Sequence, residues 1–137
     1  MAGGVVLAAL ASGCGDPTLR KSPRPPYLLV AKGPYQSLYG PDGRIQRLVY
    51  DGNGDGTADA VILYGPDGKV HEAQVDTDFD KVVDRWEYFD DGVLVRLGFT
   101  RYKPGVPDYW DVIGPDGAPT RREYDDDGDG KVDRSEP

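Results

Sequence analysis

Short runs of apolar and aromatic residues alternate along the chain with tight turns rich in glycine, proline and aspartate. The tetrapeptide Gly-Pro-Asp-Gly begins at residues 40, 65 and 114, and Asp-Asp-Gly at 90–92 takes its place once. Proline presets φ at the second position of a β-turn, and glycine accepts the positive φ that such turns require near their end. Each turn is therefore predicted to join two antiparallel strands into a hairpin.

The turns belong to a repeat of about 25 residues. Successive turns are preceded by an apolar residue at spacings of 25, 25 and 24; these residues are Tyr39, Tyr64, Phe89 and Ile113. Val61, Trp86 and Trp110 share a second position of the repeat, and such equivalent positions form cross-strand ladders in stacked hairpins. The repeat predicts strands at 44–50, 58–64, 69–75, 84–89, 93–102, 108–113 and 118–124.

The first strand of each repeat is less regular than the second. Ile45, Val70 and Val95 are assigned to one position, but the apolar residues after them change faces, which indicates a β-bulge. Residues 27–39 form a degenerate half-repeat at the front, and no segment has the i, i+3, i+4 apolar spacing of a helix. We expect an all-β fold with little or no helix: an antiparallel meander of about eight strands, with acidic loops at one edge. Both an open twisted sheet and a barrel are compatible with this sequence pattern.

Composition supports this expectation and narrows the range of functions. The 137 residues suffice for one domain, and 19 Gly and 12 Pro are too many for a helical bundle. Nine Tyr and two Trp supply apolar area to a thin core. The formal net charge is −8, which argues against electrostatic binding to nucleic acid or anionic lipid, because both are polyanions.

Three acidic segments occupy the same place in their repeats and share the pattern D-x-[DN]-x-D-x-x-x-D. Oxygen atoms at positions 1, 3, 5 and 9, with the main-chain carbonyl of position 7, can surround a hard cation. Oxygen ligands without His or Cys favour Ca²⁺ over zinc or copper, and Mg²⁺ is disfavoured because it demands near-octahedral geometry. The candidate ligands are Asp51, Asn53, Asp55, Thr57 and Asp59; Asp76, Asp78, Asp80, Val82 and Asp84; and Asp125, Asp127, Asp129, Lys131 and Asp133. Glu87 and Glu136 stand at position 12 of the second and third loops.

The acidic loops are not equivalent. The third keeps every position of the pattern, whereas the first has Ile62 at position 12. The second has Lys81 in place of the glycine at position 6, which puts its sharp turn in question. The corresponding segment of the remaining repeat, 100–108, retains only Asp108 and is expected to bind no metal.

These loops resemble the calcium-binding loops of EF-hands, dockerins, thrombospondin type 3 repeats and integrin-type FG-GAP repeats. The resemblance covers nine to twelve residues of each loop and implies calcium sites built from the residues named above. Strand-like flanks depart from the EF-hand, in which helices flank the loop. The β-hairpin setting of FG-GAP repeats is closer, although the period here is shorter than in those propellers.

The N-terminal residues differ in character from the repeats. Residues 5–11 are apolar but too short to span a bilayer, and small residues then lead to Cys14, the single cysteine. The segment LASGC at 10–14 resembles the lipobox of bacterial lipoproteins, which implies cleavage before Cys14 and lipidation of that residue. Four prolines in 16–26 exclude regular helix and interior strand. We expect a signal peptide at 1–13, the lipidated cysteine and a tether at 14–26, and the β-repeat domain at 27–137.

Nothing in the sequence points to an enzyme. His71 is the single histidine, and there is no G-x-S-x-G or P-loop motif. One hypothesis is a calcium-stabilised lipoprotein with a structural or binding role, anchored to a bacterial membrane, the outer one being favoured, or else secreted. The other is a calcium-independent interaction module that uses an aromatic strand face with Tyr102, Tyr109 and Trp110. Either could bind a protein or glycan, which the sequence does not identify; nucleic acid is not expected.

Overall fold

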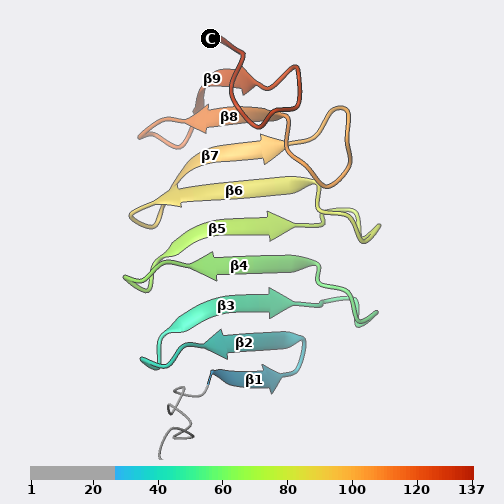
Figure 1. The fold of residues 1–137 in the computed structure, drawn as a ribbon, viewed down its shortest axis with the longest axis vertical. Coiled ribbons are helices and arrows are strands. Elements are labelled where there is room, and N and C mark those ends of the chain that lie inside the picture. Colours follow the sequence, from blue (N-terminus) through green and yellow to red (C-terminus); the bar gives the residue numbers. More distant parts are fainter. Residues whose placement is uncertain (1–26) are drawn as a thin grey trace, which may run out of the picture.

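The computed structural model describes residues 27–137, so the predicted signal peptide, Cys14 and tether lie outside the described residues. Ten strands form one antiparallel meander, in which each strand pairs with its neighbours in sequence (Figure 1). The strands are β1 (Leu28–Lys32), β2 (Tyr35–Tyr39), β3 (Ile45–Tyr50), β4 (Ala60–Tyr64), β5 (Val70–Val75), β6 (Arg85–Asp90), β7 (Val93–Phe99), β8 (Tyr109–Ile113), β9 (Pro119–Tyr124) and β10 (Arg134–Glu136). The all-β meander is confirmed, and no helix occurs among these residues.

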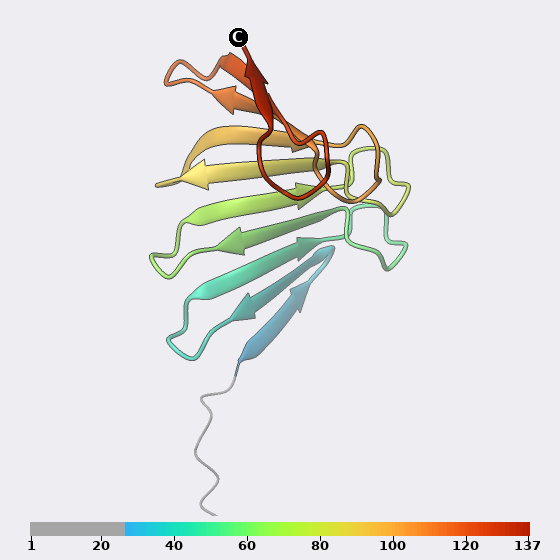
Figure 2. The same cartoon turned by 45° about the horizontal axis from the view of Figure 1, so that its top comes forward.

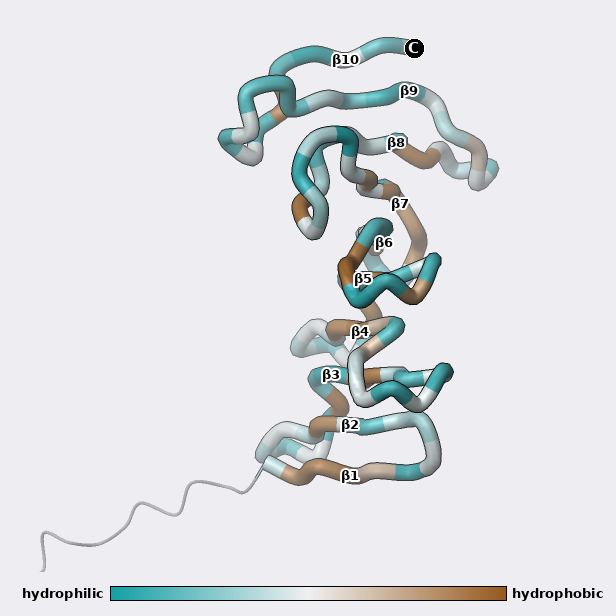
Figure 3. Tube along the Cα trace, turned by 90° about the vertical axis from the view of Figure 1, so that its right-hand side faces the viewer, coloured by the Kyte–Doolittle hydropathy of each residue, from teal (hydrophilic) through white to brown (hydrophobic). Residues whose placement is uncertain are grey.

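The sheet is open, twisted and one layer thick. Within residues 27–137 its order runs from β1 to β10 without a return, so among these residues β1 and β10 are free edges and no barrel closes. Figure 2 shows the strands fanning out as the sheet twists, and Figure 3 shows them stacked edge-on in a single layer. The tight turns lie at one edge of each hairpin and the long loops at the other, as predicted (Figure 1).

Two elements raise the number of strands to ten. Gly33 and Pro34 divide the front half-repeat into β1 and β2, whose register pairs Lys32 with Tyr35. At the other end, β10 pairs with β9 after the last acidic loop. The sequence did not reveal β10, because three polar residues carry no alternation of apolar and polar positions.

A β-bulge is present in the first strand of each repeat, as the sequence indicated. Across β2 and β3, Leu38 pairs with Arg47 and Tyr39 with Ile45, so Gln46 is the extra residue. The equivalent extra residues are His71, Val95 and Thr120. The assignment of Val95 to the position of Ile45 and Val70 is therefore wrong. Leu94 takes that position, because the turn between β6 and β7 is one residue shorter than the Gly-Pro-Asp-Gly turns.

The best-buried part of the sheet is a cross-strand ladder on one face. Trp86 pairs with Gly98, and Gly98 with Trp110, so the glycine lies between two indoles. Both tryptophans are 5% exposed, and with Ala73 they make up the buried apolar residues of 27–137. A Cβ on Gly98 would lie 2.9 Å from Cδ1 of Trp110, so glycine leaves the space that the indole fills. The ladder predicted for Val61, Trp86 and Trp110 is confirmed.

The opposite face carries an aromatic stack. Tyr109 packs against Phe99 and Tyr124, with ring centroids 5.3 and 6.3 Å apart. Because adjacent residues of a strand point to opposite faces, Tyr109 and Trp110 do not share a face. Tyr102 lies in the loop that follows β7 and is 71% exposed. The structure thus does not gather these three aromatic residues into one strand face.

Candidate metal-binding loops

Four loops of equal length lie along one edge of the sheet. They span 51–59, 76–84, 100–108 and 125–133, and each connects the two strands of a hairpin. In every loop the main-chain N–H of the last aspartate donates to the carbonyl of the residue that ends the preceding strand, at 2.7–3.1 Å. This bond closes each loop at the same place, so equivalent positions can be compared directly.

The first aspartate of each acidic loop organises the backbone around its carboxylate. In the last loop, Oδ1 of Asp125 accepts a bond from the N–H of Gly128 at 2.7 Å, and Oδ2 accepts one from Gly130 at 2.8 Å. Asp51 and Asp76 accept the equivalent bonds from positions 4 and 6 of their loops. Asp76 and Asp125 are 4% and 3% exposed, so their charges are held away from bulk water.

The second loop keeps this backbone path without its glycines. Phe79 and Lys81 have φ of 63° and 76°, close to the 78° and 85° of Gly128 and Gly130. A left-handed conformation costs a residue with a Cβ about 1–2 kcal/mol. The substitution of Lys81 for glycine therefore strains the turn but leaves its geometry intact.

Two loops each bring three carboxylates together. Asp76, Asp78 and Asp84 offer oxygen atoms that all lie within 4.8 Å of one another. Asp125, Asp127 and Asp133 do the same. Ligands at 2.3–2.6 Å from one calcium ion can lie this far apart, so each Asp triad could hold a metal ion.

The Asp triads differ from the surrounding acidic residues in their electrostatic partners. Within 27–137, none of the six triad carboxylates lies within 4.0 Å of a side-chain nitrogen of lysine, arginine or histidine. In contrast, Asp126 pairs with Arg134 at 2.6 Å and Asp129 with Lys131 at 2.7 Å. The side-chain bonds from Arg134 and Lys131 lower the pKa values of those two carboxyls. Clustered carboxylates without a cation repel one another, which favours a bound metal ion.

The remaining predicted ligands lie around the Asp triads rather than in them. At position 5, Asp80 and Asp129 accept the N–H of position 7 at 2.8 Å, and the position-7 residues are Val82 and Lys131. Glu87 lies on β6, 2.9 Å from Nη2 of Arg85. Glu136 lies on β10, where it bonds the Arg134 guanidinium and accepts the Tyr124 hydroxyl. Neither glutamate joins the 4.8 Å groups.

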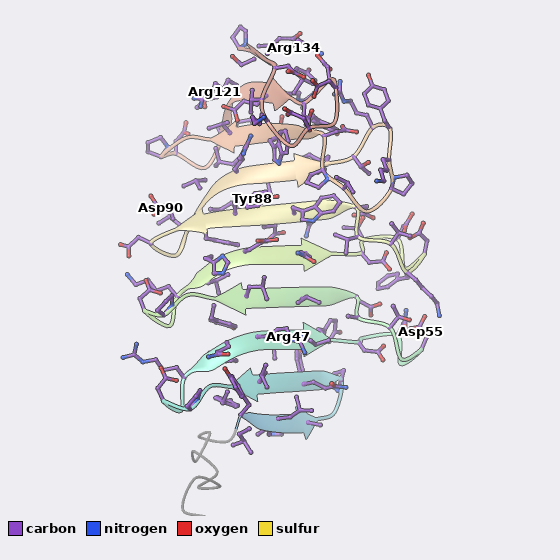
Figure 4. All side chains as sticks on the ribbon, in the orientation of Figure 1. Arg47, Asp55, Tyr88, Asp90, Arg121 and Arg134 are labelled. Carbon is purple, nitrogen blue, oxygen red and sulfur yellow. The ribbon has the colours of Figure 1, made fainter. Side chains whose placement is uncertain are left out.

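The first acidic loop forms no carboxylate triad. Asn53 stands at its third position and donates its amide N–H to Asp59 at 3.2 Å. Asp55 accepts the N–H of Thr57 and lies 3.0 Å from Nζ of Lys81 in the next loop, as Figure 4 helps to locate. The N–H of Thr57 and the ammonium group of Lys81 both lower the pKa of the Asp55 carboxyl. Asp51 and Asp59 accept loop N–H groups as their counterparts in the other acidic loops do, so this loop differs in its Asn53 amide and in the ion pair of Asp55.

The loop without ligands contains an arginine that sequence reasoning missed. Arg101 Nε lies 3.0 Å from Oδ1 of Asp108, and its Nη2 is 3.3 Å from the Asp125 carbonyl and 3.1 Å from Asp126. The guanidinium thus balances the buried Asp108 and joins two neighbouring loops. The sequence did contain a signal for this ion pair: segment 100–108 keeps one carboxylate, Asp108, and has a basic residue at its second position.

The titration of Asp108 gives a test of this arrangement. Burial acts to raise the pKa of its carboxyl, but bonds from Arg101 and from the Tyr102 N–H outweigh burial and hold the pKa below its ordinary value. Its stabilisation is then complete above the unfolded-state pKa of about 3.9 and is lost as pH falls through the folded-state pKa.

We expect the free energy of unfolding to depend less steeply on pH below about 4 in Asp108→Asn than in the parent. Urea unfolding at a series of pH values measures both slopes. Equal slopes would show that the Asp108 carboxyl does not titrate differently in the two states.

Comparison with known proteins shows only a likeness of fold. No protein-family model matches the sequence, and no curated protein matches it significantly. A crystal structure of accessory secretory proteins 1, 2 and 3 of Streptococcus pneumoniae is similar, with a TM-score of 0.54 and 16% sequence identity. The similarity covers 72% of this chain and 18% of that one, so this chain spans less than a fifth of the matched chain. In 27–137 there is no helix of the length and apolarity needed to cross a membrane.

Proposed function

We propose that this chain is a calcium-binding, extracytoplasmic lipoprotein whose β-repeat is stabilised by Ca²⁺ and serves a structural or binding role. The observation that carries the proposal is the contrast among its carboxylates. Those of the two Asp triads are clustered and lack a cationic partner within the described residues, whereas Asp55, Asp108, Asp126 and Asp129 have one. In each Asp triad a bound metal ion supplies the positive charge that lysine and arginine side chains supply to the other four carboxylates.

Calcium fits these loops better than other metals. Each Asp triad offers oxygen atoms alone, and main-chain carbonyls and water can complete the irregular sixfold to eightfold shell that Ca²⁺ accepts. A cation that binds only the folded state, at a hundred times its Kd, adds about 2.7 kcal/mol per site to the free energy of unfolding. Few residues of this single-layer sheet are buried, so that contribution is a large share of its stability.

Calcium titration of the metal-free chain tests the proposal. We expect calorimetry to detect two sites, and the melting temperature to rise with Ca²⁺ and fall with EGTA. Asp78→Asn and Asp127→Asn should each remove one site, because each takes a charge from a different Asp triad.

Asp90→Asn is the matched control. It removes an exposed carboxylate from the opposite edge of the sheet (Figure 4) and should leave both sites intact. Absence of binding heat together with an unchanged melting curve would refute the calcium site. The lipid anchor is tested separately by the mass of the mature N-terminus and by its loss in Cys14→Ser.

A further inference from the structure

The two free edges of the sheet differ in chemistry. β10 is a three-residue strand of polar and charged residues followed by Pro137, which protects that edge against pairing. β1 has the sequence LLVAK, and all five of its residues are exposed. An apolar strand at a free edge is unusual in a soluble sheet and indicates a surface that is covered by something else.

The apolar side chains of this edge project from both faces of the sheet, Leu28 and Val30 from one and Leu29 from the other, and together make an apolar patch along the edge. Five of the ten exposed large apolar residues of 27–137 lie on or beside β1 and β2; they are Tyr27, Leu28, Leu29, Val30 and Tyr35. Leu28 and Leu29 are 57% and 59% exposed although they sit in a paired strand. Tyr27, Leu28, Val30 and Tyr39 line a groove of about 590 Å³ against the turn at 40–43. Figure 3 shows the same concentration of apolar residues on β1 and the hydrophilic character of β10.

Charge is distributed unequally along the chain. Residues 1–50 contain six Lys or Arg and two Asp, whereas residues 51–137 contain ten Lys or Arg and 22 Asp or Glu. Lys32 and Arg47 form no ion pair within the described residues. In contrast, every arginine of β6–β9 and of the loop after β7 forms one; these are Arg85, Arg96, Arg101, Arg121 and Arg122. The net charge of −8 argued against an anionic partner, but the excess of acidic over basic residues lies beyond residue 50. Lys32, on β1, and Arg47, two strands away on β3, are thus unpaired positive charges at this end of the sheet, where the first acidic loop begins at Asp51 beside the β1–β2 turn.

We propose that the β1–β2 edge docks on an anionic phospholipid surface. Leu28, Leu29 and the two tyrosines enter the headgroup region, while Lys32 and Arg47 lie near the lipid phosphates. The inference rests on the proposed anchor at Cys14. Only twelve residues separate Cys14 from Tyr27, so the anchor would hold this edge within about 45 Å of the bilayer. The acidic loop at 125–133, at the other end of the sheet, then lies far from the like-charged surface (Figure 1).

Vesicle flotation with the full chain carrying Cys14→Ser tests docking without the anchor. The vesicles are phosphatidylcholine alone or in equal parts with phosphatidylglycerol, and EGTA is present so that calcium cannot bridge acidic loops to lipid. We expect binding to the anionic vesicles that weakens with salt, and little binding to phosphatidylcholine.

Two double variants separate the apolar and charged contributions. Leu28→Ser with Leu29→Ser should weaken binding about tenfold, because two inserted side chains are lost. Lys32→Glu with Arg47→Glu should weaken binding to anionic vesicles about fivefold for each positive side-chain charge removed. The matched control is Val93→Ser with Val132→Ser, which removes exposed apolar side chains far from β1 and should bind like the parent. Circular dichroism confirms that each variant is folded.

Three outcomes would overturn the inference. The first is no binding to anionic vesicles; the second is unchanged binding by the leucine variant, which would assign binding to the basic tether. The third is a dimer, seen by sedimentation without vesicles and lost in the leucine variant, which would assign the edge to a second copy of the chain. Calcium titration of the same variants is independent of lipid, so failure of docking with intact calcium sites leaves the proposed function standing.

Discussion

Replacing Trp110 by alanine is expected to lower the free energy of unfolding by about 4 kcal/mol. Its indole is 5% exposed in a sheet that has no second layer to bury other side chains. It packs over Gly98 and beneath the Arg96 guanidinium, whose Cζ lies 4.3 Å from the ring centroid. Because both faces of the sheet are open, water can enter the space that the truncation leaves, but the lost contacts are not replaced.

Urea unfolding of Trp110→Ala and two further variants checks this prediction. Trp110→Phe should lower the free energy of unfolding much less than Trp110→Ala does. Phenylalanine keeps an aromatic ring and removes the indole N–H, which is buried without a hydrogen-bond partner in the described part of the chain. Tyr102→Ala, at a 71% exposed position, should change the free energy of unfolding by less than about 0.5 kcal/mol. Equal losses at Trp110 and Tyr102 would contradict the assignment of the core to the indole ladder.

Gly98→Ala is the complementary change on the same ladder. The added Cβ would meet Trp110 at 2.9 Å and Pro107 Cβ at 3.2 Å, so the indole or the loop must shift. We expect this single methyl group to destabilise the fold, although alanine normally favours strand over glycine.

Removing the Arg101 side chain is expected to cost about 3 kcal/mol, because it leaves the buried charge of Asp108 with main-chain N–H donors but no cation. The Asp108 side chain is 10% exposed and that of Arg101 22%, so water can compensate only part of the loss. The guanidinium also stacks on Tyr102 and Tyr124, with Cζ 4.6 and 4.8 Å from the ring centroids, and those contacts vanish as well.

A double-mutant cycle isolates the ion pair from these other contacts. Asp108→Asn should cost much less in an Arg101→Ala background than in the parent, because the unpaired charge is then removed. Lys103→Ala, at an exposed position of the same loop, is the matched control and should be close to neutral. The cost of Arg101→Ala should be present in EGTA as well as in calcium, since the Arg101–Asp108 ion pair involves no metal ion. A loss of stability that appears only with calcium would place Arg101 in a metal site instead.

Much of the fold could be predicted because its signals are local. Gly-Pro-Asp-Gly determines where each hairpin turns, and the positions relative to these turns identified the indole ladder and the edge that carries the acidic loops. The bulges were indicated for the same reason, since an extra residue changes the face of every apolar residue after it. Val95 was assigned wrongly because a turn shorter by one residue shifts the count, which apolar pattern alone does not reveal.

The candidate site was predictable in its residues but not in its grouping. The ligand pattern identified the three acidic loops, and the structure gathers carboxylate triads in only two of them among the described residues. The pattern did not reveal that Lys81 reaches across to Asp55, or that Arg101 reaches Asp125 and Asp126 from another hairpin. These contacts join residues more than twenty positions apart, and they form only once the sheet sets the hairpins side by side.

The sequence by itself determined most of the strands, the tight turns and the acidic edge, because each depends on the conformational preferences of a few neighbouring residues. Only the tertiary structure decided that the sheet stays open and one layer thick. Twist accumulates over all ten strands, and nothing in a single repeat specifies whether the last strand meets the first. It also decided which carboxylates have cationic partners and which remain clustered, because that depends on the path of each loop and, for Asp55 and Asp126, on contacts between hairpins. The calcium proposal rests on that division.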